Sequence, residues 1–290
     1  MSNTIDQAFI TQYESEVKLA YQQMGSKLRN TVRLKTNVTG STVTFQKLGK
    51  GSASQKSRNG DVPVMNAVHS TASATMADWY AADYVDKLDE LKTNIEERQV
   101  VVQTGAFGLG RKIDALVISA ITASLGSSYQ NSTAYGGYGS SAYNNALQDA
   151  VMEGFKALND QDVPDDGGRI CLVGPHQWNH LLKVTEFASS DYIGPNTLPW
   201  LAGTQAKRWL NTLFMMHTGL GTANSAASRI CLMYHKTAVG LGEGQSVTSM
   251  IDWVPTKAAH LVDNMMSAGA IRIEDTGVWA FYAQEAKMTA

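Results

Sequence analysis

Two histidines one helical turn apart have the spacing closest to a catalytic or metal-binding motif in this sequence. His176 and His180 stand in "HQWNH", and zinc proteases place two imidazoles at this spacing on a helix, with a glutamate beside the first as general base. Gln177 occupies the position of that glutamate, and no third ligand is evident. We interpret the pair as part of a helix surface beside Trp178 and expect no metal site.

Two glycine-rich stretches have the composition of nucleotide-binding loops without their spacing. In residues 105–112, "GAFGLGRK", the lysine is one place late for a phosphate loop, and no serine or threonine follows it. Residues 240–246, "GLGEGQS", lack the G-x-G-x-x-G spacing and precede no amphipathic helix, so we interpret them as a plain loop. No G-x-S-x-G elbow occurs, and Cys171 and His176 are near each other only along the chain. We therefore expect no catalytic residue and no cofactor.

Composition indicates a large, well-packed and weakly charged protein. The 290 residues are 43% hydrophobic and 17% charged, with a formal net charge of −2. This length predicts one large domain or two intertwined ones, and the charge gives no general attraction for nucleic acid. We find no run of about 18 apolar residues and no signal peptide in "MSNTIDQAF". Cys171 and Cys231, in "RICLV" and "RICLM", are expected to be buried free thiols in a reducing compartment.

Hydrophobic periodicity predicts a mixed set of helices and strands. An amphipathic helix is expected over residues 11–28, with a possible capping box at its start. A period of two from residue 32 predicts strands. A long helix should begin at Thr93 or Asn94, and a second should cover residues 143–159. The long helix has a predicted seam of Val102, Ala106, Leu109, Ile113, Leu116 and Ala120. Strands and short helices then alternate, and the end of the chain, "GAIRIEDTGVWAFYAQEAK", is expected to form a hairpin or strand pair.

Residues 49–63, "GKGSASQKSRNGDVP", form a long polar stretch that has almost nothing to bury. Loops of this length without apolar anchors are usually functional or disordered. In and beside it stand four cations and one acid, Lys47, Lys50, Lys56, Arg58 and Asp61. The charge then reverses, because residues 78–97 contain seven acids and two lysines. Six of these acids are Asp83, Asp86, Asp89, Glu90, Glu96 and Glu97.

Three glycines interrupt the long helix, namely Gly105, Gly108 and Gly110. Each costs about 1 kcal/mol relative to alanine in a helix. We expect that they bend the helix or let another backbone approach it closely.

The order of these elements resembles the tailed-phage major capsid proteins of the Hong Kong 97 fold. The resemblance rests on the approach "WYAADYVDKLDELKTN", the helix "IEERQVVVQTGAFGLGRKIDALVISAITA" and the segment "FKALNDQDVPDDGGRICLVGPHQWNHLL". In the second half, "YHKTAVGLGEG", "WVPTKAAHLV" and "MSAGAIRIEDTGVWAFYAQEA" resemble the final strands of that family. The resemblance covers nearly the whole chain and rests on the order of the elements and on loose sequence patterns.

This resemblance implies an α+β fold with five segments. They are an N-terminal arm (1–40), an extended loop or E-loop (41–77), a peripheral domain (78–165) with a spine helix at about 94–124, an axial domain (166–255), and a return to the peripheral domain (256–290). The implied function is that of a structural subunit of an icosahedral shell around a phage double-stranded DNA genome. An encapsulin-type nanocompartment is the alternative, and a hydrolase or nucleotide-binding enzyme is a further one that the missing motifs disfavour.

The resemblance also implies partners. The extended loop would reach over a neighbouring copy, with its cations facing the acids of residues 83–97, and copies would form hexamers and pentamers. Because the first predicted helix begins near residue 11, we expect a separate scaffolding protein rather than a long fused one. A portal protein, a possible decoration protein and loose contact with packaged DNA complete the expected partners, without a membrane. The protein would be located in the virion shell after assembly in the host cytoplasm.

Overall fold

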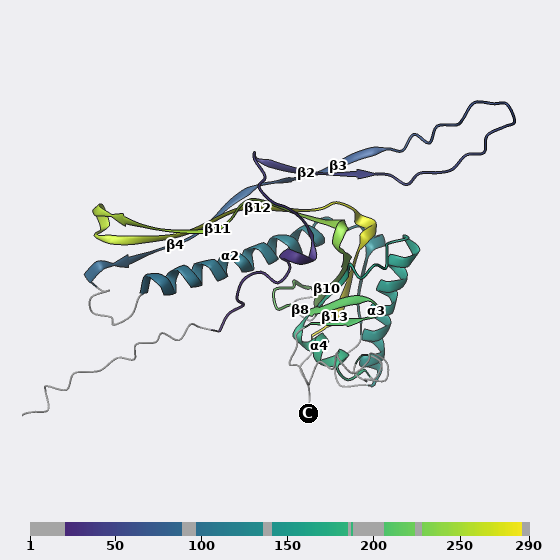
Figure 1. Cartoon of the computed structure of the whole chain (residues 1–290). Coiled ribbons are helices and arrows are strands. Elements are labelled where there is room, and N and C mark those ends of the chain that lie inside the picture. Colours follow the sequence, from purple (N-terminus) through teal and green to yellow (C-terminus); the bar gives the residue numbers. More distant parts are fainter. Residues whose placement is uncertain are drawn as a thin grey trace, which may run out of the picture.

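The structure is a computed structural model that describes residues 21–88, 97–135, 141–184, 187, 206–223 and 228–285. Within these residues the chain forms a four-stranded sheet, a seven-stranded sheet and a two-stranded hairpin. Figure 1 shows the four-stranded sheet extending to one side of a compact body and the hairpin extending to the other. No helix in the described ranges is long and apolar enough to cross a membrane.

The elements have the following bounds. The helices are α2 (Glu97–Thr122), α3 (Ser141–Asp160) and α4 (Pro175–Leu181), with 3-10 turns at Arg29–Thr31, Ser127–Tyr129, Lys236–Ala238, Pro255–Lys257 and Asp275–Gly277. The four-stranded sheet has the order β1 (Arg33–Lys35), β11 (Val239–Val254), β12 (Ala259–Arg272), β4 (Ala77–Asp86). The seven-stranded sheet has the order β5 (Gln130–Tyr135), β13 (Val278–Gln284), β10 (Ser228–His235), β6 (Arg169–Val173), β8 (Thr212–Met216), β7 (Ala206–Trp209), and β9 (Thr222–Ala223) pairs with β10. The hairpin consists of β2 (Thr42–Leu48) and β3 (His69–Thr75).

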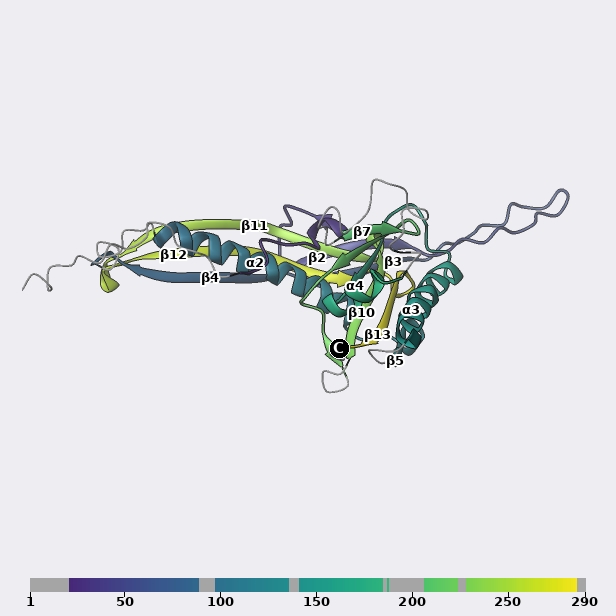
Figure 2. The ribbon, with the colours of Figure 1, turned by 90° about the horizontal axis from the view of Figure 1, so that it is seen from below.

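Helix α2 runs along one face of the four-stranded sheet, as Figures 1 and 2 both show. Side chains alternate between the two faces of a strand, and on β12 Val262 and Met266 are buried on the α2 side. Met266 joins the same core cluster as Leu109 and Ile113 of α2. The opposite face of this sheet therefore carries the intervening residues of each strand.

The seven-stranded sheet is buried on both faces, which explains the continuous apolar runs "ICLV" in β6 and "ICLMY" in β10. All five residues of β6 are buried. Ile170 and Leu172 face the core shared with α2, whereas Cys171 and Val173 face the core shared with α3. The predicted burial of both free cysteines is confirmed, because Cys171 and Cys231 are 0% exposed and unpaired.

The base of the hairpin packs on the end of the four-stranded sheet nearest the body, on the side away from α2. A Cβ atom at Gly240 would meet the Phe45 ring at 2.6 Å, and one at Gly242 would meet Val43 at 2.6 Å. These glycines thus make room for the hairpin inside strand β11. The prediction of a plain loop over residues 240–246 is wrong, because the stretch is part of a strand.

The long helix and the second helix are confirmed, and the predicted seam of the long helix needs a correction. The predicted start of α2 and residues 11–20 lie outside the described residues. In its second half α2 buries Val117, Ile118 and Ile121 rather than Leu116 and Ala120. The helix there lies between the two sheets, so it buries adjacent positions on each turn.

The helix predicted over residues 11–28 is wrong for its described part. Residues 21–28 form bends without helical hydrogen bonds, and Gly25 has a φ of +72°. The backbone N–H groups of Lys27 and Leu28 donate to the Asp114 carboxylate instead of to carbonyls one turn earlier. A tertiary contact thus replaces the local helix.

The strand pairings also correct the expected end of the chain and its segment boundaries. Strands β12 and β13 belong to different sheets, so they form no terminal hairpin. Strand β11, expected in the axial segment, pairs with β1 and β12 alongside α2, whereas β13, expected in the return segment, lies in the seven-stranded sheet. Helix α3 packs on that sheet too.

Candidate functional site

The most conspicuous feature of the surface is the loop of residues 49–68, which joins β2 to β3 and projects far from the body (Figure 1). Its two limbs run together at the base, where the Gly49 N–H donates to the Val68 carbonyl over 2.9 Å. At the tip, Gly60 donates to the Ser57 carbonyl over 3.1 Å, and Asn59 has a φ of +62°. Nearly every residue of the loop is exposed. The loop is therefore an ordered two-limbed arm without a core of its own.

The charged residues predicted on this loop have different surroundings. Lys50 binds Asp162 of its own chain, with 2.8 Å between Nζ and Oδ2, and this contact lowers the pKa of the exposed Asp162. Among the described residues, Lys56, Arg58 and Asp61 form no hydrogen bond or ion pair, and all three are exposed. The fifth residue, at position 47, is half-buried on β2. Of these five residues, Lys50 alone thus has an ion pair in the described part of the chain.

The returning limb of the loop carries a set of exposed apolar side chains that the sequence analysis did not single out as functional. The exposed fractions are 73% for Val62, 76% for Val64, 55% for Met65 and 72% for Val68. Large apolar side chains concentrated on one exposed segment mark an interaction surface. The signal was present in the sequence as "VPVMNAV", immediately after the polar stretch.

The predicted acidic counter-surface does not form a single face in the described residues. Asp83 pairs with Val262 on the α2 side of the sheet, whereas Asp86 pairs with Ala259 on the opposite side. Glu97 is the first residue of α2. The remaining three predicted acids, Asp89, Glu90 and Glu96, lie outside the described residues.

The face of the four-stranded sheet opposite α2 combines aromatic, apolar and acidic side chains. The register places Tyr80 beside Met265, and Met250 beside Asp263. We define the open face as Tyr80, Ala82, Tyr84, Asp86, Met250, Asp252, Leu261, Asp263 and Met265. Tyr80 and Met250 are 65% and 50% exposed.

One carboxylate of the open face is incompletely paired. The Oδ1 atom of Asp263 is shielded from solvent and has no hydrogen-bond partner among the described residues. A buried polar atom left without a partner costs about 1–3 kcal/mol. A cation or donor from outside this chain would satisfy it.

Two of the three α2 glycines meet other backbone or side-chain atoms of this chain closely. A Cβ atom at Gly110 would lie 2.6 Å from the Gly25 backbone, and one at Gly105 would collide with Asn264. At Gly110 another backbone thus lies against the helix, whereas at Gly105 the close neighbour is the Asn264 side chain. At Gly108 the nearest atom to a Cβ would be in Arg111, at 3.7 Å, so this chain leaves the position open.

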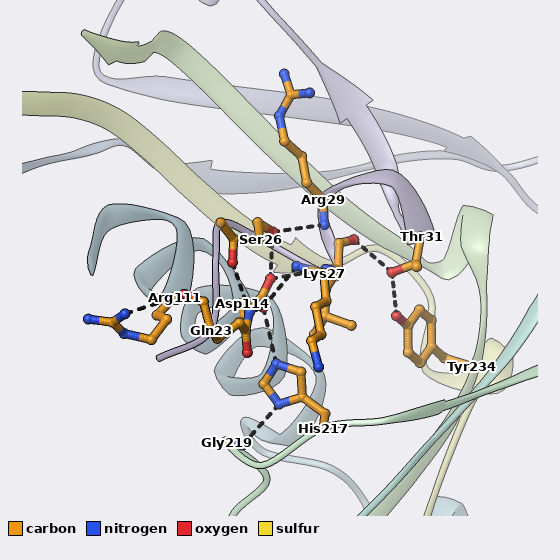
Figure 3. A network of polar contacts seen from close by, with 12 residues as sticks. Gln23, Ser26, Lys27, Arg29, Thr31, Arg111, Asp114, His217, Gly219 and Tyr234 are labelled. Atoms are coloured by element: carbon orange, nitrogen blue, oxygen red, sulfur yellow. Dashed lines mark hydrogen bonds and ion pairs between the residues drawn. The ribbon is translucent and has the colours of Figure 1, made fainter. Parts of the chain in front are cut away.

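A buried carboxylate, Asp114, joins three parts of the chain (Figure 3). It is 1% exposed and accepts from Gln23, Ser26 and the backbone N–H groups of Lys27 and Leu28. Its fifth partner is His217, whose Nε2 lies 3.1 Å from Oδ2 and whose Nδ1 accepts from the Gly219 N–H. Burial alone would raise the pKa of Asp114, but the hydrogen bonds from His217, Ser26 and the backbone outweigh it and lower this pKa. The other ionisable side chains nearby are Lys27, Arg111, Tyr234 and the Arg29–Glu243 pair.

The histidine motif has a structural role. On α4, Gln177 donates to the carbonyl of Gln284 over 3.1 Å and so attaches the helix to β13. Trp178 and His180 are buried, so our expectation of a surface pair is wrong for His180. Burial, with the nearby charges of Lys183 and His176, lowers the pKa of His180 to about 4. Among the described residues no three His, Cys, Asp or Glu side chains are grouped to hold a metal.

Comparison with known proteins places the chain among shell-forming proteins. The family described as phage capsid protein matches residues 5–285. No curated protein matches.

Solved structures with the same fold include phage capsids. The capsid structure of cyanophage P-SCSP1u has a TM-score of 0.72 at 14% identity, covering 99% of this chain and 96% of that one. The capsid of Ralstonia phage GP4 has a TM-score of 0.69 at 12% identity, covering 100% and 99%. A structure from Mycobacterium phage Che8 has a TM-score of 0.68 at 16% identity, covering 94% and 97%.

Proposed function

The chain belongs to the phage capsid protein family, and we propose that each copy holds its neighbour in the shell through the loop of residues 49–68. The protein is a major capsid protein, a structural subunit, and its fold is that of tailed-phage capsids. The nanocompartment alternative is not favoured. How one copy binds the next is the part that we infer.

The observation that carries the proposal is the apolar returning limb. Val62, Val64 and Val68 are each more than 70% exposed on an arm that projects away from its own body. Full burial of one such side chain contributes about 1.5–3 kcal/mol. A segment that cannot bury its apolar side chains at home gains this free energy when a neighbour covers them.

The open face is the surface that best fits this limb. The hairpin base already packs on the same side of the sheet, at Gly240 and Gly242, so the chain's own hairpin covers the near end. No helix or strand of the described residues covers the far end, where Lys257 Nζ lies 3.7 Å from the centre of the Tyr84 ring. The far end exposes Tyr80, Tyr84 and Met250. A neighbour's loop laid along this face would bury apolar atoms of both copies.

Charge supports the same partner. The tip cations Lys56 and Arg58 have no partner in the described residues of their own chain, and the open face supplies Asp252 and Asp263. Unlike charges guide association and fix register more than they add affinity. Of the acids first expected to face the loop, Asp86 belongs to the open face, whereas Asp83 lies on the α2 side of the sheet. Asp89, Glu90, Glu96 and Glu97 remain part of the proposal as acids that follow β4 in the sequence.

Other parts of the proposal follow from the family. The four-stranded sheet with α2 would act as the peripheral domain, and the seven-stranded sheet as the axial domain at the centres of hexamers and pentamers. A separate scaffolding protein, a portal protein, a possible decoration protein and loosely held DNA would be the partners during assembly in the host cytoplasm.

A disulfide crosslink tests the proposal. The loop between β2 and β3 and the four-stranded sheet extend in opposite directions (Figure 1), so a bond between cysteines at position 64 of the loop and position 250 of β11 requires two copies. The native cysteines are fully buried, which keeps the background low. Shells of Val64→Cys/Met250→Cys should give covalent multimers on mild oxidation. Shells of the control Val64→Cys/Met152→Cys, whose second site is an exposed position on α3, should give monomers. Monomers from both variants would contradict the proposal.

A further inference from the structure

Residues 21–27 are attached to the rest of the chain by polar contacts that converge on one carboxylate. Gln23 Nε2 and Ser26 Oγ each lie 2.5 Å from an Asp114 oxygen, and the Lys27 N–H lies 3.1 Å from Oδ2 (Figure 3). Hydrogen bonds to a charged group are stronger than neutral ones. Arg111 of α2 adds two further bonds, since its Nη1 donates to Gln22 Oε1 over 2.7 Å and to the Gln23 carbonyl over 3.4 Å. The attachment therefore depends on two side chains of α2, of which Asp114 receives more of the bonds.

The same segment buries no large apolar side chain. Tyr21 and Met24 are 93% and 77% exposed, and burial of large apolar side chains begins only at Leu28, which is 0% exposed. Gly25 lies against Gly110 through backbone atoms alone. Lifting residues 21–27 away would thus remove no large apolar side chain from the core, whereas Leu28 would hold the start of the body in place as a hinge.

The space beside the segment is not filled by it. A cavity of about 510 Å³ lies between the segment, α2 and β11, lined among others by Gly25, Phe107, Ile113 and Glu243. Close packing would resist movement of a segment as a unit. Here packing leaves room, and hydrogen bonds fix the position.

His217 extends the attachment to a third part of the chain. It lies just after β8 of the seven-stranded sheet, is 4% exposed, and binds Asp114 on α2. When residues 21–27 are docked, one carboxylate therefore links the N-terminal segment, the helix of the four-stranded sheet and the seven-stranded sheet.

We propose that residues 21–27 form a latch that closes on Asp114 independently of the body, and that the closed latch presents Tyr21 and Met24 to a second copy of this chain in the shell. The second copy rests on the proposed function. A shell places a second copy of the chain beside each subunit. Two exposed apolar side chains, held in place by the polar contacts to Asp114, are a suitable contact for that copy.

Amide hydrogen exchange on the full-length unassembled subunit tests the latch. In Asp114→Asn, the Lys27 and Leu28 N–H groups lose their charged acceptor, and their exchange should speed up by about tenfold or more, the equivalent of about 1.4 kcal/mol. Exchange in α3 and β6 should stay unchanged. The exposed acid Asp160 on α3 provides the control, and Asp160→Asn should match the wild type throughout. If Asp114→Asn does not fold, Gln23→Ala/Ser26→Ala removes two donors from the segment side and serves the same test.

Shell yield of the same variants tests the role of the latch in assembly. Local release at residues 21–28 with a loss of closed shells supports the proposal. Unchanged exchange at Lys27 and Leu28, or a rise spread over both sheets, would overturn the latch. Local release with wild-type shell yield would overturn its role in assembly. These readings are separate from the loop crosslink, so the latch and the loop proposal can fail independently.

Discussion

Replacing Val62 and Val64 by serine should weaken the association between copies more than any other change to the loop that we consider. Both side chains are about three-quarters exposed in the isolated chain. If a neighbour buries that exposed part, the pair contributes about 2–4.5 kcal/mol at each interface, from about 1.5–3 kcal/mol for a fully buried valine. Two exposed ion pairs at the tip would contribute only about 0.4–2 kcal/mol together. The apolar limb, rather than the cations, should therefore dominate the affinity between copies.

The assay compares the melting temperature of the unassembled subunit with the yield of closed shells. Because both valines are exposed, Val62→Ser/Val64→Ser should change subunit stability by no more than about 0.5 kcal/mol. The lost interface free energy corresponds to about 30- to 2,000-fold in association, so shells should fail to form at concentrations where the wild type assembles. Met152→Ser, at an exposed methionine on α3, should leave both quantities unchanged.

Two results would refute this reasoning. A wild-type shell yield in the double variant would show that no neighbour buries the limb. A fall in melting temperature that matches the fall in yield would show that the limb supports its own subunit instead.

Three further predictions concern charge, the helix glycines and pH. Lys56→Glu/Arg58→Glu should leave the subunit folded and make shell formation weaker and salt-dependent, since screening shortens the reach of these charges. Shell yield measured from about 0.05 to 1 M salt checks this prediction. A dependence of shell yield on salt equal to that of the wild type would contradict it. Gly110→Ala should destabilise the subunit by about 1–3 kcal/mol, because the new Cβ would lie 2.6 Å from another backbone. Gly108→Leu should leave the melting temperature nearly unchanged and lower shell yield where a neighbour approaches α2. Equal melting temperatures for both variants would contradict the assignment of the close contact to this chain. Because the folded-state pKa of Asp114 is lowered, its contribution to stability is present above the ordinary aspartate pKa of about 3.9 and is lost as the pH falls through the folded pKa. The free energy of unfolding, measured as the pH is lowered, should therefore change less for Asp114→Asn than for the wild type. Parallel curves for the two proteins would contradict this.

The parts of the fold that could be predicted are those in which local pattern and tertiary environment agree. Residues 170–173, "ICLV", form a continuous apolar run, and β6 is covered on both faces. The helical spacing of Leu109 and Ile113 likewise survives in α2. The helix expected up to Leu28 failed because a distant carboxylate, Asp114, takes the backbone N–H groups that a helix would have used. No sequence spacing signals a contact across 86 residues.

The candidate site was predictable in location but not in chemistry. The polar stretch of residues 49–63 drew attention to the loop, and its charges suggested an electrostatic partner. The structure shows that Lys50 has its partner within the chain and that the exposed apolar limb follows the polar stretch. Asp252 and Asp263 were missed because their position on the open face depends on the pairing of β11 with β12, which a single sequence does not specify. For the same reason, the sequence did not indicate which strands belong to which sheet. Strands β12 and β13 follow each other in the sequence but belong to different sheets.

Electron cryomicroscopy of shells assembled from the wild-type chain tests the central claim most directly. The account predicts closed shells in which residues 49–68 of each copy lie on the open face of a neighbour, with Val62 and Val64 against Tyr80, Tyr84 or Met250. Closed shells in which the loop projects into solvent or packs on its own chain would contradict it.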